Sequence, residues 1–498
     1  MSLRRFVIKQ FAKKIHKDIV RMSQNAVNDQ AIIFQSIIKK ATNTQFGKDH
    51  HFDKINNPID FAQAVPIRGY EEFRSYIDMV INGRKNIIWP GSPKYFAKTS
   101  GTTSGVKYIP ISKESIKYHI NTARNAILNY VHLTGKDIFS KKMIFLSGSP
   151  TLSKKGSIPT GRLSGIVNHE IPGWIRPNQL PTFNTNCIED WESKLGKIVE
   201  ETVDKNMSLI SGIPPWVQMY YEQLLMKTGQ QSIKDIFPHF ELFIHGGVNY
   251  KPYKPILDKL HGANIDTLET YPASEGFIAF QDKIGEDELL LNTNAGMFYE
   301  FIEPGYTSDP QNKRLVLSQV KLNIDYALII SSNAGLWAYN IGDTIRFTSL
   351  DPYRIKVSGR IKHFISAFGE HVISKEVEEA MDVVSKSKNL VIHEFTIAPQ
   401  INPQNQELPH HEWFIEFENK PEDLELIAKS LDEEICRQNI YYRDLIKGHV
   451  LQPLKISPLQ TNAFRAYMKK AGKLGGQNKV PRLTNDRIIA DALQLYKI

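Results

Sequence analysis

The chain has 498 residues, of which 41% are hydrophobic and 23% are charged; this composition is typical of a folded globular protein, and the length predicts one large and one smaller domain. The two cysteines, Cys187 and Cys436, do not have the spacing of a disulfide framework or a zinc site, which favours a reducing cytoplasm, and no apolar run reaches the roughly 18 residues that spanning a bilayer requires. The net charge of +9 suits a polyanionic ligand, but the sequence has neither a zinc finger nor an RNA-recognition signature, so we expect no nucleic-acid partner and no transmembrane segment.

The N-terminal segment predicts a basic amphipathic helix. Lysines and arginines surround a set of apolar residues that recur at helical spacing, namely Ile8, Phe11, Ile15, Ile19 and Met22. We expect this helix to dock on its own domain with its basic face in water. A helix that lies on a membrane surface is the alternative.

Between residues 113 and 271, short apolar runs alternate with helix-like stretches. The apolar runs predict buried strands at residues 143–146, 209–210, 241–244 and 265–268. The stretches between them predict helices at residues 114–131, 190–203, 215–226 and 254–260. Such alternation indicates a parallel sheet with helices on both faces. Ligands of these sheets bind at the carboxyl ends of the strands, so we expect the chemistry there.

The pattern changes twice further along the chain. Residues 290–350 are rich in predicted strands and poor in helices, with strands at residues 297–302, 314–317, 326–330 and 345–348. After Gly359, strands at residues 391–397, 413–417 and 450–456 alternate with helices at residues 374–384 and 422–439. We therefore predict an α/β fold. Its large N-terminal domain, residues 1–358, has parallel sheets covered by helices plus a small β-subdomain. A smaller, mobile C-terminal α+β domain, residues 359–498, follows a hinge.

The first candidate for chemistry is a loop of seven small or hydroxylated residues between two apolar strands: Thr99, Ser100, Gly101, Thr102, Thr103, Ser104 and Gly105. Backbone N–H groups and hydroxyls of such a loop can approach phosphate oxygens, because no side chain blocks the way. Lys107 follows it and could neutralise phosphate charge. The loop is not a Walker A motif, since that motif has four residues between its glycines and a Lys directly after the second. A flexible surface loop is the alternative.

A second candidate ends the predicted strand at residues 241–244. Gly246 and Gly247, followed by Val248, would let a flat ring such as adenine lie against the backbone. An ordinary turn explains the paired glycines equally well.

A third candidate follows the strand at residues 265–268. Tyr271 offers a stacking face, Ser274 beside Ala273 offers a hydroxyl for a phosphate, and Glu275 offers a hard oxygen ligand for Mg²⁺. The alternative is a capped turn in which Ser274 and Glu275 open a helix.

Two more motifs lie near the predicted domain boundary. Asp343 stands beside Gly342, where a carboxylate could accept hydrogen bonds from both ribose hydroxyls; a turn aspartate is the alternative. Arg360 could bind ribose or phosphate, and Lys362 falls where a hinge between the domains is expected.

Taken in order, these motifs make the sequence resemble the adenylate-forming superfamily, and within it the plant auxin-responsive acyl-acid amido synthetases and their bacterial relatives. The loop from Ser100 to Lys107 is similar to the family's Ser-Ser-Gly-Thr-Ser phosphate motif. Residues 271–275 are similar to Tyr-x-x-Ser-Glu, and residues 339–343 to Tyr-x-x-Gly-Asp. Residues 477–482 resemble a Gln-x-Lys-x-Pro-Arg segment. The resemblance runs from about residue 64 to residue 482 and so covers most of the chain.

The resemblance implies a set of ligand contacts. Residues 99–104 would hold the phosphates of ATP, and Gly246, Gly247 and Tyr271 would enclose adenine. Ser274 would contact the α-phosphate, Glu275 would bind Mg²⁺, and Asp343 and Arg360 would bind ribose. Lys479 is a candidate catalytic residue, although the superfamily's usual C-terminal Gly-Lys signature is absent. The glycine-rich loop is one residue shorter than the plant pattern.

The helix after the phosphate loop is the expected wall of an acyl pocket. Tyr118, Thr122 and Arg124 on that helix would lie near the strand ends, and Arg124 could pair with a substrate carboxylate; a solvated helix charge is the alternative.

We predict an ATP- and Mg²⁺-dependent ligase that converts a carboxylic acid to an acyl-AMP and transfers the acyl group to an amine such as an amino acid. An acyl-CoA ligase with a thiol acceptor and a non-catalytic nucleotide-binding regulatory protein are the alternatives. The sequence reveals neither the acid nor the oligomeric state.

Overall fold

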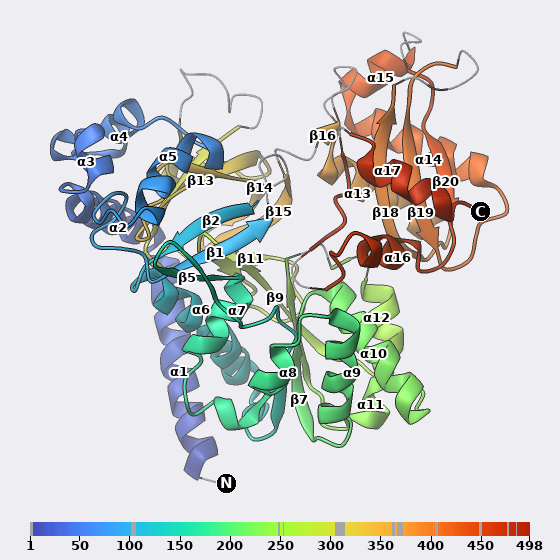
Figure 1. The fold of residues 1–498 in the computed structure, drawn as a ribbon, viewed down its shortest axis with the longest axis horizontal. Helices are drawn as coiled ribbons and strands as arrows, with labels where there is room; N and C mark the ends of the chain where they lie inside the picture. Colours follow the sequence, from blue (N-terminus) through green and yellow to red (C-terminus); the bar gives the residue numbers. More distant parts are fainter. Residues whose placement is uncertain are drawn as a thin grey trace. The chain divides into compact units, whose positions relative to one another are not determined.

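The computed structural model describes residues 3–100, 106–247, 250, 251, 253–303, 314–360, 364, 365, 372–401, 403, 407–447, 451–475, 478–484 and 486–498. The chain divides into two compact units (Figure 1). Unit 1 comprises Met1–Tyr250 and Ile256–Val357, and unit 2 comprises Lys251–Pro255 and Ser358–Ile498.

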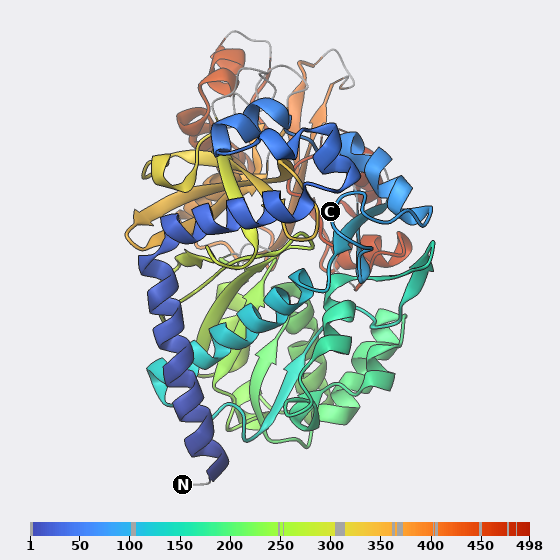
Figure 2. The same ribbon diagram turned by 90° about the vertical axis from the view of Figure 1, so that its left-hand side faces the viewer.

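Unit 1 begins with helices. They are α1 (Leu3–Gln24), α2 (Ala26–Ala41), α3 (Gln45–Asp49), η1 (Phe52–Lys54), α4 (Pro58–Ala64) and α5 (Tyr70–Ile81). The predicted N-terminal helix is confirmed: α1 buries Ile15, Ile19 and Met22 in a core cluster with α6 (Ser115–Thr134), and Figure 2 shows it running along the outside of the unit. Phe11 was wrongly expected on the buried stripe; Ala12 is buried instead, and Phe11 is exposed.

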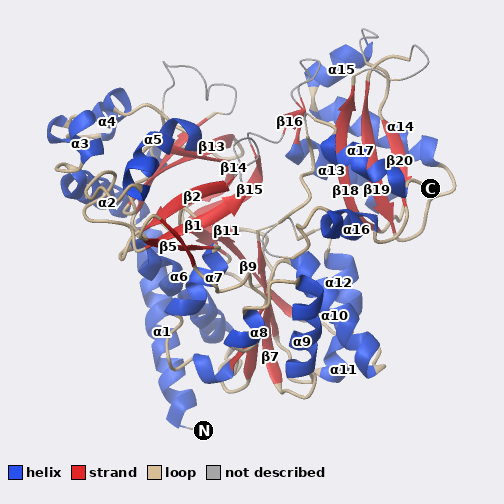
Figure 3. Cartoon of the chain, viewed as in Figure 1, coloured by secondary structure: helices blue, strands red, loops and turns tan. Residues whose placement is uncertain are grey.

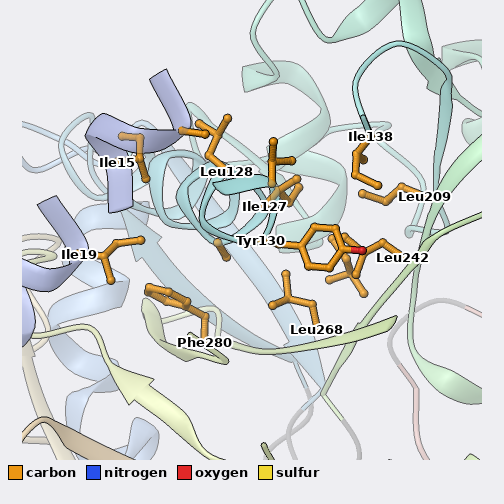
Figure 4. Packing of buried hydrophobic residues seen from close by; sticks show 14 of the residues in the cluster. Ile15, Ile19, Ile127, Leu128, Tyr130, Ile138, Leu209, Leu242, Leu268 and Phe280 are labelled. Atoms are coloured by element: carbon orange, nitrogen blue, oxygen red, sulfur yellow. The ribbon is translucent and has the colours of Figure 1, made fainter. Parts of the chain in front are cut away.

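The predicted parallel sheet is present. Its strands are β6 (Gln179–Leu180), β3 (Lys142–Phe145), β7 (Met207–Ser211), β8 (Leu242–Gly246) and β9 (Asp266–Pro272), in that spatial order. Helix α6 packs on one face, where Leu128 and Tyr130 meet Leu209, Leu242 and Leu268 (Figure 4). Figure 3 shows further helices on the other side of these strands: α9 (Trp191–Thr202), α10 (Pro214–Thr228), α11 (Ile233–Ile236) and α12 (Lys254–His261).

The predicted small β-subdomain is not a separate sheet. Beyond β9 the same sheet continues through β10 (Phe277–Phe280), β11 (Leu289–Leu291), β15 (Tyr353–Arg360), β14 (Tyr339–Leu350), β13 (Asp325–Ser332) and β12 (Met297–Ile302). Pairing is parallel from β6 to β9 and antiparallel across β9–β10, β10–β11, β11–β15 and β12–β13–β14. The eleven strands therefore form one mixed sheet among the described residues, where the sequence pattern predicted parallel sheets.

One predicted strand of this region is wrong. Residues 314–317 form only a single bridge, Phe301 with Leu315, and then enter η4 (Leu317–Gln319). Directly before this bridge, Arg314 Nε lies 2.8 Å from Glu300 Oε1, and both side chains are almost fully buried. The apolar run Leu315-Val316-Leu317 therefore follows a buried ion pair and turns into a 3-10 helix instead of continuing as a strand.

A second sheet of unit 1 was not predicted as such. Its order is β2 (Val106–Ile111), β1 (Tyr95–Ser100), β5 (Ile158–Gly161) and β4 (Ser153–Lys155). β1 pairs antiparallel with β2 and parallel with β5. Helix α7 (Leu163–Glu170) and η2 (Arg176–Asn178) lead back to β6 of the larger sheet, and α8 (Phe183–Asn186) follows β6.

Unit 2 is α+β. Strands β18 (Ile392–Gln400), β19 (His410–Phe417) and β20 (Lys455–Leu459) form its sheet, and α13 (Ser374–Ser387) and α14 (Leu424–Gln438) share one core cluster with it. The remaining elements are β16 (Phe364–Ile365), β17 (Val372–Ile373), α15 (Ile440–Lys447), α16 (Ala463–Lys470), α17 (Ile488–Leu493) and η5 (Gln494–Tyr496). In the described part of the strand predicted at residues 450–456, pairing begins at Lys455, because Leu451 and Leu454 are buried at a spacing of three rather than alternating.

Candidate active site

Two of the predicted ligand-binding side chains meet directly. Tyr271 near the end of β9 donates a hydrogen bond from its hydroxyl to Asp343 Oδ2 over 2.6 Å, although the two residues lie 72 positions apart in sequence. Both side chains are buried. A hydrogen bond to a charged acceptor in a buried place is strong, so Tyr271 fixes the direction of the Asp343 carboxylate.

Asp343 owes its position to an irregularity in β14. The pairing with β13 shifts register between Ala327 and Ile329, and the extra residues on β14 include Gly342 and Asp343. Gly342 has a φ of +86°, and its N–H donates to Asn340 Oδ1 over 2.9 Å. Bulges of this kind re-aim a side chain that would otherwise follow the pleat. Asp343 is therefore a bulge residue, not the simple turn aspartate of the alternative reading.

The segment between β9 and β10 is a tight β-turn. Ala273 N donates to Gly276 O over 2.9 Å, and Gly276 N donates to Ala273 O over 3.2 Å. Ser274 and Glu275 are half-buried at its tip. The alternative reading, in which these two residues open a helix, is wrong, because β10 starts at Phe277 and pairs back along β9.

Glu275 lies close to Tyr339, the first residue of β14. Burial raises the pKa of Tyr339 well above its ordinary value, and the negative charge of Glu275 contributes next. The hydrogen bond from Tyr271 to Asp343 joins the end of β9, just before the turn that carries Glu275, to β14. This arrangement brings together three of the predicted residues: Tyr271, Glu275 and Asp343.

The predicted phosphate loop joins β1 to β2. Ser100 pairs with Val106 and Thr99 with Lys107, so the loop closes a hairpin; Gly101, Thr102, Thr103 and Ser104 lie outside the described residues. Tyr70, the first residue of α5, holds the hairpin: its hydroxyl accepts a hydrogen bond from Tyr108 N over 2.9 Å. Lys107 Nζ lies 6.0 Å from the centroid of the same ring. No sequence motif indicated this role of Tyr70.

At the end of β8, close packing requires glycine at position 246, and the backbone conformation favours glycine at position 247. A Cβ atom on Gly246 would lie 2.2 Å from the carbonyl oxygen of Thr270 on β9, so the parallel pairing of β8 and β9 needs glycine there. Gly247 has a φ of +78°, and Val248 lies outside the described residues. The ring of His245 stacks on Tyr250 at 4.0 Å between centroids, and burial lowers its pKa to about 3, so His245 is neutral.

The three expected acyl-pocket residues do not share one face of α6. Thr122 is buried and accepts a hydrogen bond from Asn292 Nδ2 over 2.9 Å. Tyr118, one turn earlier, is partly exposed. Arg124 points elsewhere: its guanidinium lies 5.4 Å from the Phe11 ring of α1 and donates to Asn125 Oδ1. Arg124 is thus packed against α1 rather than placed with Thr122.

The remaining predicted residues belong to the boundary and to unit 2. Arg360 ends β15, and only its backbone is described; Lys362 lies outside the described residues. Lys479 is exposed and precedes a segment that is fixed to β18, where Thr396 Oγ1 donates to Pro481 O over 2.6 Å and Ile397 N donates to Arg482 O over 2.9 Å.

A buried polar cluster around Ser147, Arg162, Asn186 and Lys194 in unit 1 has no counterpart among the predicted motifs. Lys194 falls within the predicted helix 190–203, where a lysine suggests a solvent-facing position. Its burial depends on distant backbone carbonyls, so no local pattern could have revealed it.

The fold is that of the GH3.15 acyl acid amido synthetase, whose solved structure superimposes with a TM-score of 0.81 at 17% identity and covers 97% of this chain and 96% of its own. Three family models match along the sequence: the GH3 family N-terminal domain at residues 15–181, the central domain at residues 290–360 and the C-terminal domain at residues 375–488. The chain therefore belongs to the GH3 family, and the expectation from the motifs is confirmed.

Curated relatives match over nearly their whole length. Indole-3-acetic acid-amido synthetase GH3.15 of Arabidopsis thaliana is 22% identical, covering 94% of this chain and 92% of its own. The 4-substituted benzoates-glutamate ligase GH3.12 of the same plant is 21% identical, covering 94% of each. Jasmonoyl--L-amino acid synthetase JAR4 of Nicotiana attenuata is 20% identical, covering 93% of this chain and 92% of its own length. Among the described helices, none is long and apolar enough to cross a bilayer.

Proposed function

We propose that the protein is an acyl-acid amido synthetase, which uses ATP to adenylate a carboxylic acid and then transfers the acyl group to the amino group of an amino acid. Membership of the GH3 family supports this activity, as do the activities of the relatives that match over more than nine-tenths of their length. Both cysteines are free thiols, which suits a reducing cytoplasm.

The observation that carries the proposal is the buried hydrogen bond between Tyr271 and Asp343 beside Glu275. In this proposal Asp343 accepts hydrogen bonds from the ribose hydroxyls of ATP, and Tyr271 holds its carboxylate ready. Adenine would lie along β8 and β9 near Gly246 and Gly247. A prearranged acceptor needs no reorganisation when the nucleotide binds.

The first step needs positioning more than covalent help from the protein. A carboxylate oxygen of the substrate attacks the α-phosphorus of ATP, the bond from that phosphorus to the bridging oxygen breaks, and pyrophosphate leaves. In the proposal, backbone N–H groups and hydroxyls of residues 99–104, with Ser274 and Lys107, stabilise the charge on the phosphate oxygens.

Glu275 suits Mg²⁺. No group of three or more His, Cys, Asp or Glu side chains able to hold a metal occurs among the described residues. Mg²⁺ in nucleotide sites needs no such cage, because it takes one or two carboxylates together with substrate phosphates and water. Bound there with ATP, it would neutralise phosphate charge.

In the second step the amine attacks the acyl carbon, the bond from that carbon to the phosphate oxygen breaks, and AMP leaves. Arg360 is proposed to contact ribose, and Lys479 to act from unit 2, which in this proposal moves on the hinge between the steps. Tyr118 and Thr122 are proposed to line the acyl pocket; the packing of Arg124 on Phe11 weighs against the same role for that residue.

The test is ATP–pyrophosphate exchange with the purified protein over a panel of aromatic, fatty and hormone-like acids. Glu275→Ala should abolish acid-dependent exchange, while Glu286→Ala, which removes an exposed carboxylate that pairs with Lys283, should leave it unchanged. Exchange that survives Glu275→Ala would remove that residue from the site. ATP binding without exchange for any acid would favour the regulatory alternative. AMP release that depends on CoA and not on an amino acid would favour the thiol ligase.

A further inference from the structure

A cluster of polar side chains is buried in unit 1, apart from the residues assigned above. Ser147 follows β3, Arg162 is the N-cap of α7, Asn186 ends α8, and Lys194 lies in the first turn of α9. Ser147, Asn186 and Lys194 are each at least nine-tenths buried. The segments that carry them meet at the carboxyl end of β3, the edge at which sheets of this kind bind ligands.

Lys194 is a buried cation that only neutral groups contact. Its Nζ donates to the backbone carbonyls of Ser147 and Asn186, each over 2.9 Å. Among the described residues no carboxylate forms an ion pair with it. Burial lowers the pKa of Lys194 to about 8; Cys187 acts in the opposite direction, and the positive charge of Arg162 lowers the pKa further. A buried charge without a counter-charge is costly unless an ion of opposite sign binds.

Arg162 adds a second positive charge to the same place. A Cβ atom built on Gly148 would lie 2.9 Å from Arg162 Cδ, so the side chain runs across Gly148, next to Ser147. Arg162 Nη1 is buried and has no hydrogen-bond partner among the described residues. A guanidinium carries five N–H donors, and buried donors are rarely left unpaired.

Two neutral side chains complete the set. The amide of Asn186 is fully buried, and neither its nitrogen nor its oxygen has a partner in the described part of the chain; the same is true of Ser147 Oγ. The two cations and these buried donors stand on segments that meet at the carboxyl end of β3, and an anion with several acceptor oxygens would satisfy them.

Strand β5, which leads into Arg162, lies next to β1, which leads into the predicted phosphate loop. Strand β5 runs parallel to β1 with Phe96 opposite Thr160 and Ala97 opposite Gly161. The residues that come next on the two segments are Lys98 and Thr99 on β1 and Arg162 after β5. Neighbouring strands are about 4.8 Å apart, so Gly161, directly before Arg162, lies about one strand spacing from Ala97, two residues before the start of the proposed phosphate-binding segment.

We propose that Lys194 and Arg162 bind the carboxylate of the amino acid acceptor, with Asn186 and Ser147 as further donors. This inference rests on the proposed function. One anion in that reaction is the carboxylate of the acyl donor, which is consumed when the anhydride forms. A buried pair of cations would stabilise this carboxylate before it reacts and so would oppose the first step. The acceptor carboxylate keeps its charge throughout, and binding it here would hold the adjacent amino group near the acyl-AMP.

The test compares Lys194→Met and Arg162→Gln with Lys197→Met, a control on the same helix whose lysine is exposed and pairs with Glu200. For each variant, KM is measured for the preferred amino acid and for the amine that its decarboxylation would give. Both site variants should raise KM for the amino acid by at least about 30-fold, the effect of removing one partner of a buried charge pair. KM for the amine, and those for ATP and the acid in pyrophosphate exchange, should not change.

Several results would overturn the inference. A higher KM for ATP would assign the cations to phosphate, and a higher KM for the acid would assign them to the donor. Equal losses for amino acid and amine, or no change in either, would exclude carboxylate binding. A lower Tm with loss of both half-reactions in both variants would leave only a structural role.

If the wild-type protein catalyses no pyrophosphate exchange with any acid, the proposed function is wrong, but the assignment of a carboxylate site can still be tested. The inference is then decided by thermal shift: an amino acid should raise the Tm of the wild type but not that of Lys194→Met, and the decarboxylated amine should raise neither. Absence of that difference would contradict it.

Discussion

At the scale of single residues, the hydrogen bond from Tyr271 to Asp343 is the contact on which nucleotide binding is proposed to depend. Tyr271→Phe keeps the ring and removes the hydroxyl, so Asp343 loses the donor that fixes its direction. Hydrogen bonds to charged groups contribute about 1.5–3 kcal/mol, so KM for ATP in pyrophosphate exchange should rise about tenfold or more.

The control is Tyr130→Phe. It also removes a bond from a tyrosine hydroxyl to an aspartate, Asp266 Oδ2 at 2.7 Å, but at the opposite end of β9. Both variants should lose stability, and only Tyr271→Phe should lose ATP affinity. An unchanged KM for ATP in Tyr271→Phe would contradict the proposed role.

A second residue-scale prediction concerns the ion pair of Arg314 and Glu300, whose side chains are 4% and 1% exposed. Arg314→Leu leaves the Glu300 carboxylate buried without its partner, and burial already raises the pKa of Glu300. We expect the variant to lose about 3–5 kcal/mol in urea unfolding. The double variant with Glu300→Leu should recover most of that loss. Weak surface ion pairs contribute at most about 1 kcal/mol, so a loss below that value in Arg314→Leu would contradict the prediction.

At the scale of elements, the approach of β8 to β9 depends on Gly246. In Gly246→Ala the new Cβ atom would overlap the Thr270 carbonyl, so the two strands must separate. We expect a loss of about 1–3 kcal/mol in the free energy of unfolding. Gly196→Ala on α9 is the control, since nothing lies within 4 Å of that Cβ position, and it should gain about 0.5–1 kcal/mol. Equal effects of both substitutions would contradict the tight pairing.

Elements with strong local signals were predictable from sequence. The helix of residues 191–202 and the strand of residues 297–302 follow from periodicity and from runs of apolar residues. The second sheet was not predictable in the same way, because its parallel pairing of β1 with β5 joins segments some sixty positions apart (Ala97 with Gly161) and β5 is only Ile158–Gly161. Likewise, the spacing of Leu451 and Leu454 reflects burial in a loop, which an apolar run alone does not distinguish from a strand.

At the scale of the whole molecule, the order of the motifs in the sequence indicated the family. The geometry of the site, in contrast, could be seen only in the folded structure. Tyr271, Glu275 and Asp343 each stood in a predicted motif, but only the bulge at Gly342 and the turn at Ala273 bring them together. Lys194 could not be found from sequence, since its environment is made by carbonyls of Ser147 and Asn186 on other elements. The acid and the acceptor depend on pocket surfaces that no motif encodes.

The most direct test of the central claim is product analysis by mass spectrometry. The purified protein is incubated with ATP, Mg²⁺, the acid that supports pyrophosphate exchange, a mixture of the twenty amino acids, and CoA. We predict AMP and an N-acyl amino acid in equal amounts. An acyl-CoA without any amide, or ADP and phosphate in place of AMP, would contradict the assignment as an acyl-acid amido synthetase.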